Sequence, residues 1–193
     1  MKLFSGLYDR VMRWSRHRHA PAYLAGLSFA ESSFFPVPPD VMLAPMSMAS
    51  PSRAIWFASL TTVASVLGGL AGYVIGFFAF EATAPLIEQL GYWDKYLKAR
   101  EWFDAWGFWA VFLAGFSPIP YKVFTITAGA IGMALVPFVM ASLIGRGARF
   151  FLVALLMAWG GEPMETVLRR YVDIAGWVVI AVVVAVVMVL QLK

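Results

Sequence analysis

Apolar residues run along this chain in long stretches, and polar residues gather in short segments between them. The stretch 54–80 carries no charged side chain. It is long enough for a tilted membrane-spanning helix, which needs about 20 apolar residues. Further spanning helices are expected over 134–159 and over 174–192, the latter valine-rich and uncharged. The pattern predicts an all-α integral membrane protein.

Two other apolar stretches, 20–53 and 107–133, are each interrupted by a cluster of prolines. Proline lacks an amide proton and clashes with the preceding turn, so each cluster predicts a break in a helix. The arms beside each break are too short to span a bilayer. Each stretch is therefore predicted to be a re-entrant hairpin. The predicted break or hinge residues are Pro36, Pro38, Pro39, Pro118 and Pro120.

The two proline clusters correspond in position. Aligning them places Pro36 on Pro118 and the acid Asp40 on the base Lys122. Each half is thus predicted to be a hairpin followed by a spanning helix. Because one spanning helix changes sides, the second hairpin must open on the opposite face from the first. The sequence therefore predicts an inverted repeat whose two breaks meet near the bilayer midplane.

Two polar segments, 1–19 and 81–106, mix charged residues with aromatic ones. We expect both to be amphipathic helices that lie in the membrane interface. For the first segment, a solvated basic arm is the alternative. The whole chain, 1–193, is then a single membrane domain. Three glycines of the first spanning helix recur every four residues and so share a face that admits a close neighbour; they are Gly68, Gly72 and Gly76.

Composition agrees with this reading. Hydrophobic residues make up 61% of the chain, against about 45–50% in soluble domains. The net charge of +4 lies mostly in the first twenty residues, and this bias predicts a cytoplasmic N-terminus in a multi-pass membrane protein. There is no cysteine, which excludes disulfides and thiolate chemistry. We expect no enzyme activity, no cofactor, no metal and no nucleic acid, since the corresponding motifs are absent.

Five charged residues are predicted at membrane depth, where an isolated charge costs about 2.5–3.5 kcal/mol. They should therefore face the protein interior. The acids suit proton coupling, and the cations suit an anion of the size of a phosphate group, because arginine matches the oxygens of phosphate. The charges thus predict a proton site beside an anion site, and a homo-oligomer is left open. The acids are Glu31 and Asp40, and the cations are Lys122, Arg146 and Arg149.

Simpler readings of these charges stay open. The two acids would pair with Lys122 and an arginine only to lock the hairpins together. Asp40 would cap the second arm of its hairpin, and Arg149 would extend to the interface. A nucleophile made by Ser117 beside Lys122 is disfavoured, because a serine at a helix break usually bonds to backbone. A metal at the two histidines is disfavoured by the flanking arginines.

Three motifs together resemble a known family: FAESSFFPVPPD at 29–40, GGLAGYVIG at 68–76 and GFSPIPYK at 115–122. They resemble the DedA family of bacterial inner-membrane proteins, also called VTT-domain or SNARE-associated proteins, and PIPYK is most similar to its YqaA-like branch. The resemblance covers about residues 20–160. It implies two opposed re-entrant hairpins and lipid translocation, with Glu31 and Asp40 as the functional acids. Typical members carry two arginines beside the second cluster, where this chain has Gly115 and Tyr121.

The function predicted from the sequence is therefore lipid transport. The leading hypothesis is a proton-coupled flippase of a lipid phosphate, such as undecaprenyl phosphate or a phospholipid. One alternative is a passive scramblase, in which no coupling exists. Another is a scaffold without transport, in which the intramembrane charges are structural.

Overall fold

The computed structural model describes residues 17–35, 37–117 and 120–160, and these ranges contain helices and turns without a strand. Most of the predicted helix 1–19, the predicted spanning helix 174–192 and the predicted breaks at Pro36 and Pro118 lie outside the described residues. The all-α prediction is confirmed for the described part. Its elements are α2 (Ala20–Ser33), α3 (Asp40–Ala49), the 3₁₀ turn η1 (Pro51–Arg53), α4 (Ala54–Gln89), α5 (Trp93–Phe116), α6 (Tyr121–Ile131) and the helix Leu135–Gly160.

Proline and glycine determine where these helices begin and end. A proline lies in the first turn of α2, where its missing N–H costs nothing. Pro39 precedes α3 and Pro120 precedes α6, so both second arms begin where a proline ends the break. Gly132 closes α6 with a left-handed φ of 73°, and Gly91 turns α4 into α5 with a φ of 72°.

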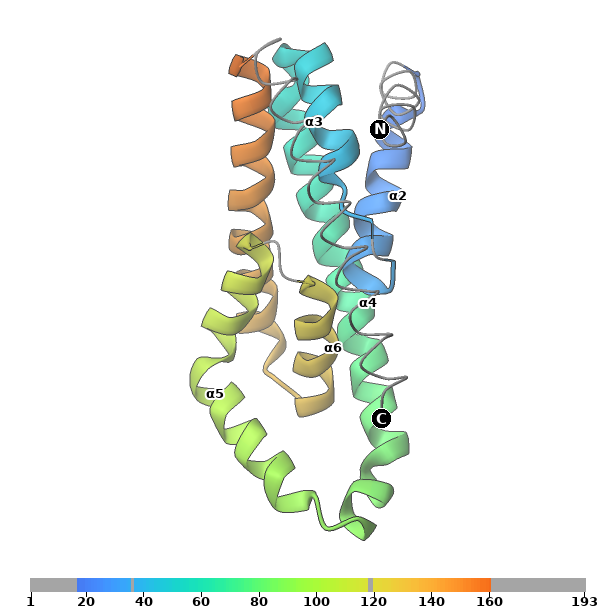
Figure 1. The fold of residues 1–193 in the computed structure, drawn as a ribbon, viewed down its shortest axis with the longest axis vertical. Helices are drawn as coiled ribbons and strands as arrows, with labels where there is room; N and C mark the ends of the chain where they lie inside the picture. The colour runs from blue at the N-terminus through green and yellow to red at the C-terminus, as the bar shows by residue number, and fades with distance from the viewer. Residues whose placement is uncertain (1–16, 36, 118–119, 161–193) are drawn as a thin grey trace, which may run out of the picture.

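The two halves have the same order of elements and run in opposite directions (Figure 1). α2 and α3 lie at one end of the long axis, and α5 and α6 lie toward the other. α2 and α5 both end near the middle of that axis. Within the described residues, two helices are long and apolar enough to cross a membrane, Pro51–Gln89 and Leu135–Gly160.

The segment 81–106 differs from its prediction. Instead of one separate interfacial helix, α4 continues to Gln89, and α5 begins at Trp93 and continues into the first arm of the second hairpin. The break between them is the short turn at Gly91. The predicted helix bounds were wrong because a change in composition does not end a helix: the mixed residues on either side of the turn are compatible with helix continuation. The interfacial position of the segment stays a prediction.

The apolar core is divided into two clusters. The first joins α2, α3 and the start of α4 to the C-terminal half of Leu135–Gly160, through residues such as Leu43 and Phe150. The second joins α5 and α6 to the N-terminal half of that helix, through residues such as Val111 and Phe138. Leu135–Gly160 therefore supports both halves of the molecule.

Close backbone contacts hold α4 against its neighbours. A side-chain methyl group at Gly68 would overlap the carbonyl oxygen of Phe29 in α2, and one at Gly76 would overlap that of Ile126 in α6. Gly72 lies against Thr125 and the backbone of Ser32. The glycine face of α4 thus contacts both hairpins, which is the small-residue packing common between membrane helices.

We predict that Gly76→Ala destabilises the protein by about 1–3 kcal/mol, because α4 and α6 would have to separate. Gly26→Ala in α2 is the matched control, since nothing lies within 4 Å of its added methyl group. That control should be neutral or stabilising by about 0.5–1 kcal/mol. Thermal unfolding of the purified variants in detergent micelles measures both, and equal stabilities would contradict the close packing.

Candidate functional site

A buried polar layer separates the two apolar clusters. Hydroxyl side chains from four elements lie in it, all fully buried or nearly so: Ser28, Ser32, Ser33, Thr61, Ser65, Thr125 and Ser142. Two pairs join α2 to α4 at the same spacing: Ser28 Oγ donates to Thr61 O at 2.8 Å, and Ser32 Oγ lies 2.7 Å from Ser65 Oγ. The layer provides hydrogen bonds in a region that is otherwise apolar.

Arg146 lies at the centre of this layer, and its side chain is 3% exposed. Its Nη2 forms a salt bridge with Glu31, and its Nε donates to Ser65 Oγ at 2.6 Å. The guanidinium lies between the rings of Tyr121 and Phe150, with centroid distances of 4.9 and 4.6 Å. One side chain thus contacts α2, α4 and α6, and its charge is both paired and hydrogen-bonded, as a buried charge must be.

Arg149 forms the second ion pair, one turn further along the same helix. Its Nη2 lies 2.5 Å from Asp40 Oδ2, and its Nη1 donates to Ser117 O at 2.9 Å. This pair is more accessible than the first, with side chains 20% and 19% exposed. Arg149 thus has both a carboxylate and a backbone carbonyl as partners. Among the described residues, its buried Nε and Asp40 Oδ1 have no hydrogen-bond partner.

The structure therefore brings four of the five predicted charges into two acid–arginine pairs. Each pair joins the first hairpin to the spanning helix of the second half. Lys122 does not meet Asp40, its counterpart in the repeat; its Nζ lies 3.4 Å from the carbonyl oxygen of Phe34. In the alternative in which the charges only lock the fold, the acids were to pair with Lys122 and an arginine; the structure pairs both acids with arginines instead. Positions that align in the two proline clusters need not be in contact.

Three residues of the site were not singled out from the sequence: Ser32, Ser65 and Tyr121. A signal for the first two was present. Ser28 and Ser32 recur at four residues in one apolar stretch, as Thr61 and Ser65 do in another. Such spacing puts both hydroxyls on one helix face. Tyr121 offered no such signal, since its role follows from its position beneath Arg146.

A comparison with protein families identifies the fold. The model described as the VTT domain matches residues 37–159. The chain belongs to the VTT-domain, or DedA, family. This confirms the resemblance seen in the proline clusters and the glycine helix, and the match covers α3 through nearly all of Leu135–Gly160. VTT-domain membership, together with the two helices of spanning length, indicates a bacterial membrane protein.

Two relatives of this VTT-domain chain match nearly all of it, and a third matches about half. An uncharacterized protein of Haemophilus influenzae is 52% identical over 180 residues, 93% of this chain and 94% of that protein. An uncharacterized protein of Histophilus somni is 47% identical over 191 residues, 99% of this chain and 100% of that protein. The undecaprenyl phosphate transporter A of Staphylococcus aureus is 34% identical over 106 residues, 52% of each chain. No solved structure matches the chain.

We predict that Arg146→Met destabilises the protein by about 3–5 kcal/mol, because it leaves the Glu31 carboxylate buried and unpaired. The double variant Glu31→Gln with Arg146→Met removes both charges and should recover most of this loss. Exposed Arg100→Gln is the control and should change stability by less than about 0.5 kcal/mol. Unfolding in micelles, analysed as a double-mutant cycle, measures the coupling. Additive losses would show that the pair does not stabilise the fold.

Proposed function

We propose that this chain moves a phosphate-bearing lipid across the bacterial inner membrane, driven by protons, as a transporter rather than an enzyme. Lipid transport is supported by membership of the VTT-domain family and by the relative named undecaprenyl phosphate transporter A. The observation that carries the finer proposal is the pair of acid–arginine contacts between the two halves. In this proposal both hairpins re-enter the membrane, and their breaks meet near its midplane.

Protons and the lipid phosphate would compete for the arginines. A protonated Glu31 or Asp40 no longer neutralises its arginine, which is left with an uncompensated charge in a medium of low polarity. A phosphate group can then replace the carboxylate, because its oxygens accept the same forked hydrogen bonds. Loss of the proton restores the ion pair and displaces the headgroup. Since each pair crosses between the halves, exchange of partners would also let one half move against the other.

Arg149 is the proposed first contact of the headgroup, because its side chain is 20% exposed whereas that of Arg146 is 3% exposed. The unpartnered Arg149 Nε and Asp40 Oδ1 leave hydrogen-bonding capacity at this place. Lys122 would act later, after it leaves the carbonyl oxygen of Phe34. Phosphate headgroups fit this set, since two guanidinium groups and an amine together match a doubly charged anion.

Arg146 also offers a replacement for the arginines that the family resemblance places at residues 115 and 121. A methyl group added at Gly115 would lie 3.2 Å from the backbone nitrogen of Arg146, and the Tyr121 ring lies beneath its guanidinium. Arg146 therefore belongs to the helix Leu135–Gly160, but it lies beside positions 115 and 121, where the family resemblance places arginines. This placement supports an anion site that is conserved in charge although it differs in sequence position.

The inverted repeat predicts that two segments lie on opposite sides of the membrane: the turn η1 after the first hairpin, and the turn between α4 and α5 with the start of α5. Single cysteines at Ser52 and at Lys95 are suitable probes, because both residues are exposed and the chain has no cysteine of its own. An impermeant maleimide applied to intact cells should label Lys95→Cys, in the periplasm. Ser52→Cys should react only after the inner membrane is opened. Labelling of both positions from the same side would contradict the inverted repeat.

Proton coupling predicts that Glu31→Gln and Asp40→Asn each lower lipid transport at least tenfold while the protein still folds. The reason is that each change keeps the shape of the side chain but removes a group that binds a proton. Transport of a fluorescent lipid phosphate into proteoliposomes, with and without a pH gradient, is the measurement. A passive scramblase would instead transport equally without the gradient. Full gradient-dependent activity in either variant would exclude that acid from the mechanism.

An exchange of the charges of Asp40 and Arg149 distinguishes a transporter from a scaffold without transport. Asp40→Arg combined with Arg149→Asp preserves the ion pair that the structure contains, with its direction reversed. If the charges only hold the fold, the exchange should restore both stability and any cellular function. If the cation binds a headgroup, stability should return without transport, because the positive charge now lies on the wrong helix. Restored transport would contradict a role for Arg149 in headgroup binding.

A further inference from the structure

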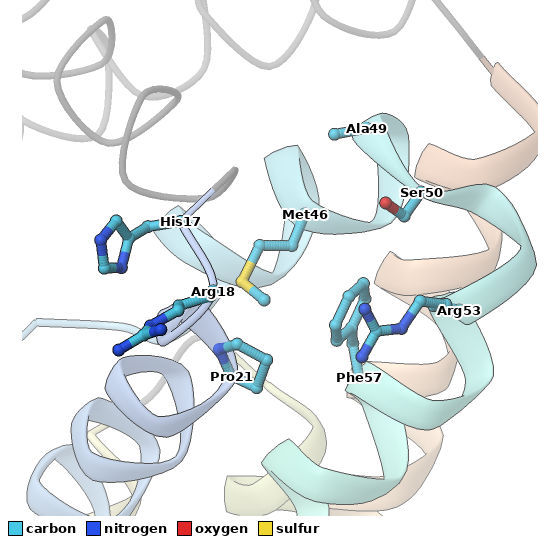
Figure 2. Close-up of a pocket in the computed structure, with 8 residues that line it drawn as sticks. All are labelled: His17, Arg18, Pro21, Met46, Ala49, Ser50, Arg53 and Phe57. Atoms are coloured by element: carbon cyan, nitrogen blue, oxygen red, sulfur yellow. The ribbon is translucent and has the colours of Figure 1, made fainter.

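A cavity of about 350 Å³ lies at the open end of the first hairpin, away from the ion pairs. This volume is within the range of roughly 300–1,000 Å³ typical of small-molecule sites. Met46 and Phe57, both nearly fully buried, line its apolar part. Figure 2 shows His17 and Arg18 on one side of the cavity, and Arg53 and Phe57 on the other, with Met46 between them.

The polar lining of this cavity is basic. His17, Arg18 and Arg53 line it together with Ser50, and no carboxylate is among the described residues that line it. The only salt bridges within the described residues are those of Arg146 and Arg149, so neither arginine of the cavity is paired there. An accumulation of cations with no acid among them favours an anionic ligand.

The hydrogen-bond donors that line this cavity are held in place and can bind an acceptor of a ligand. His17 Nδ1 accepts the backbone N–H of His19 at 3.3 Å, which leaves Nε2 of the neutral ring as a donor. Arg18 uses Nε to donate to His19 Nε2 at 2.8 Å, so its terminal amines remain for a ligand. Arg53 lies with its guanidinium carbon 5.2 Å from the ring centre of Phe57, a stacking that holds it at the cavity wall.

The starts of α2 and α4 favour the same class of ligand, whereas the C-terminal end of α3, which also lies at the cavity, carries the opposite end of a helix dipole. Residues of the cavity lie at the starts of α2 and α4, and neither helix has an acidic residue in its first turn. Arg53 is itself the N-cap residue of α4. The cations of the cavity and the positive ends of these two helix dipoles repel one another, and a bound anion would compensate this repulsion.

We infer that this cavity binds a phosphate group, carried either by the headgroup of an anionic lipid or by free phosphate. The site is separate from the transport site proposed above. It lies at the C-terminal end of α3, whereas Asp40 begins that helix, and nine residues at about 1.5 Å each separate the two by roughly 14 Å. The inference therefore does not depend on lipid transport.

The chain has two histidines, His17 and His19, so histidine-selective ¹⁵N labelling gives a simple NMR spectrum in which one ring reports directly on the cavity. The protein is placed in phosphatidylcholine nanodiscs, and His19→Gln assigns the signals. In one arm inorganic phosphate is titrated against chloride at equal ionic strength. In the other arm phosphatidic acid replaces part of the phosphatidylcholine, without free phosphate. The His17 ring signal should move in a saturable manner in at least one arm.

Three variants distinguish binding in the cavity from general attraction of phosphate to surface charge. Arg53→Gln should weaken phosphate binding at least tenfold. Ala49→Phe fills the cavity without changing any charge, so it should abolish the response in both arms, whereas the exposed Arg100→Gln should leave it intact. A response to free phosphate assigns a soluble ligand, and a response to phosphatidic acid alone assigns a lipid headgroup. A response that chloride reproduces, that persists in Ala49→Phe, or that is absent in both arms would overturn the inference.

Discussion

The neutralisation of one buried cation is the constraint on which this structure depends. Arg146 lies in the middle of an apolar helix bundle with 3% of its side chain exposed. Removal of one partner from such a buried pair costs about 3–5 kcal/mol, because it leaves an uncompensated charge in the interior. Its partners come from α2 and α4, and the rings that enclose it come from α6 and from its own helix. The charge therefore requires both halves to be assembled before it can be buried, and it makes their association specific.

The hydroxyls and glycines around this centre follow from the same requirement. Four helices approach the guanidinium closely only if their facing residues are small. The glycines of α4 bring α2 and α6 to backbone contact, and the serines fill the remaining positions while they donate hydrogen bonds. The polar layer thus lies between the two apolar clusters, which share the helix Leu135–Gly160. A polar layer between two cores is a suitable place for a molecule to change its internal contacts.

Much of this architecture could be predicted from the sequence because its signals are local. Proline clusters end helices wherever they occur, and a four-residue glycine repeat marks a face in any helix, so the breaks and the close contacts of α4 were accessible. The helix bounds within the segment 81–106 could not be predicted, since charged and aromatic residues are compatible with both an interfacial helix and the extension of a spanning helix. The partner of Asp40 was also inaccessible. Its alignment with Lys122 reports on a repeat, whereas its contact with Arg149 depends on how the halves dock.

The two arginines of Leu135–Gly160 hold different arms of one hairpin: Arg146 holds α2 through Glu31, and Arg149 holds α3 through Asp40. Their separation along the helix is a rise of about 4.5 Å, the product of three residues and the α-helical rise. Both acids, one on each side of the proline break, are therefore held by the same rigid helix. A single residue inserted between the arginines would turn one of them by about 100° around that helix, so that the two could no longer face the same hairpin. The two arms of the first hairpin are thus tied to each other through a helix that belongs to the other half.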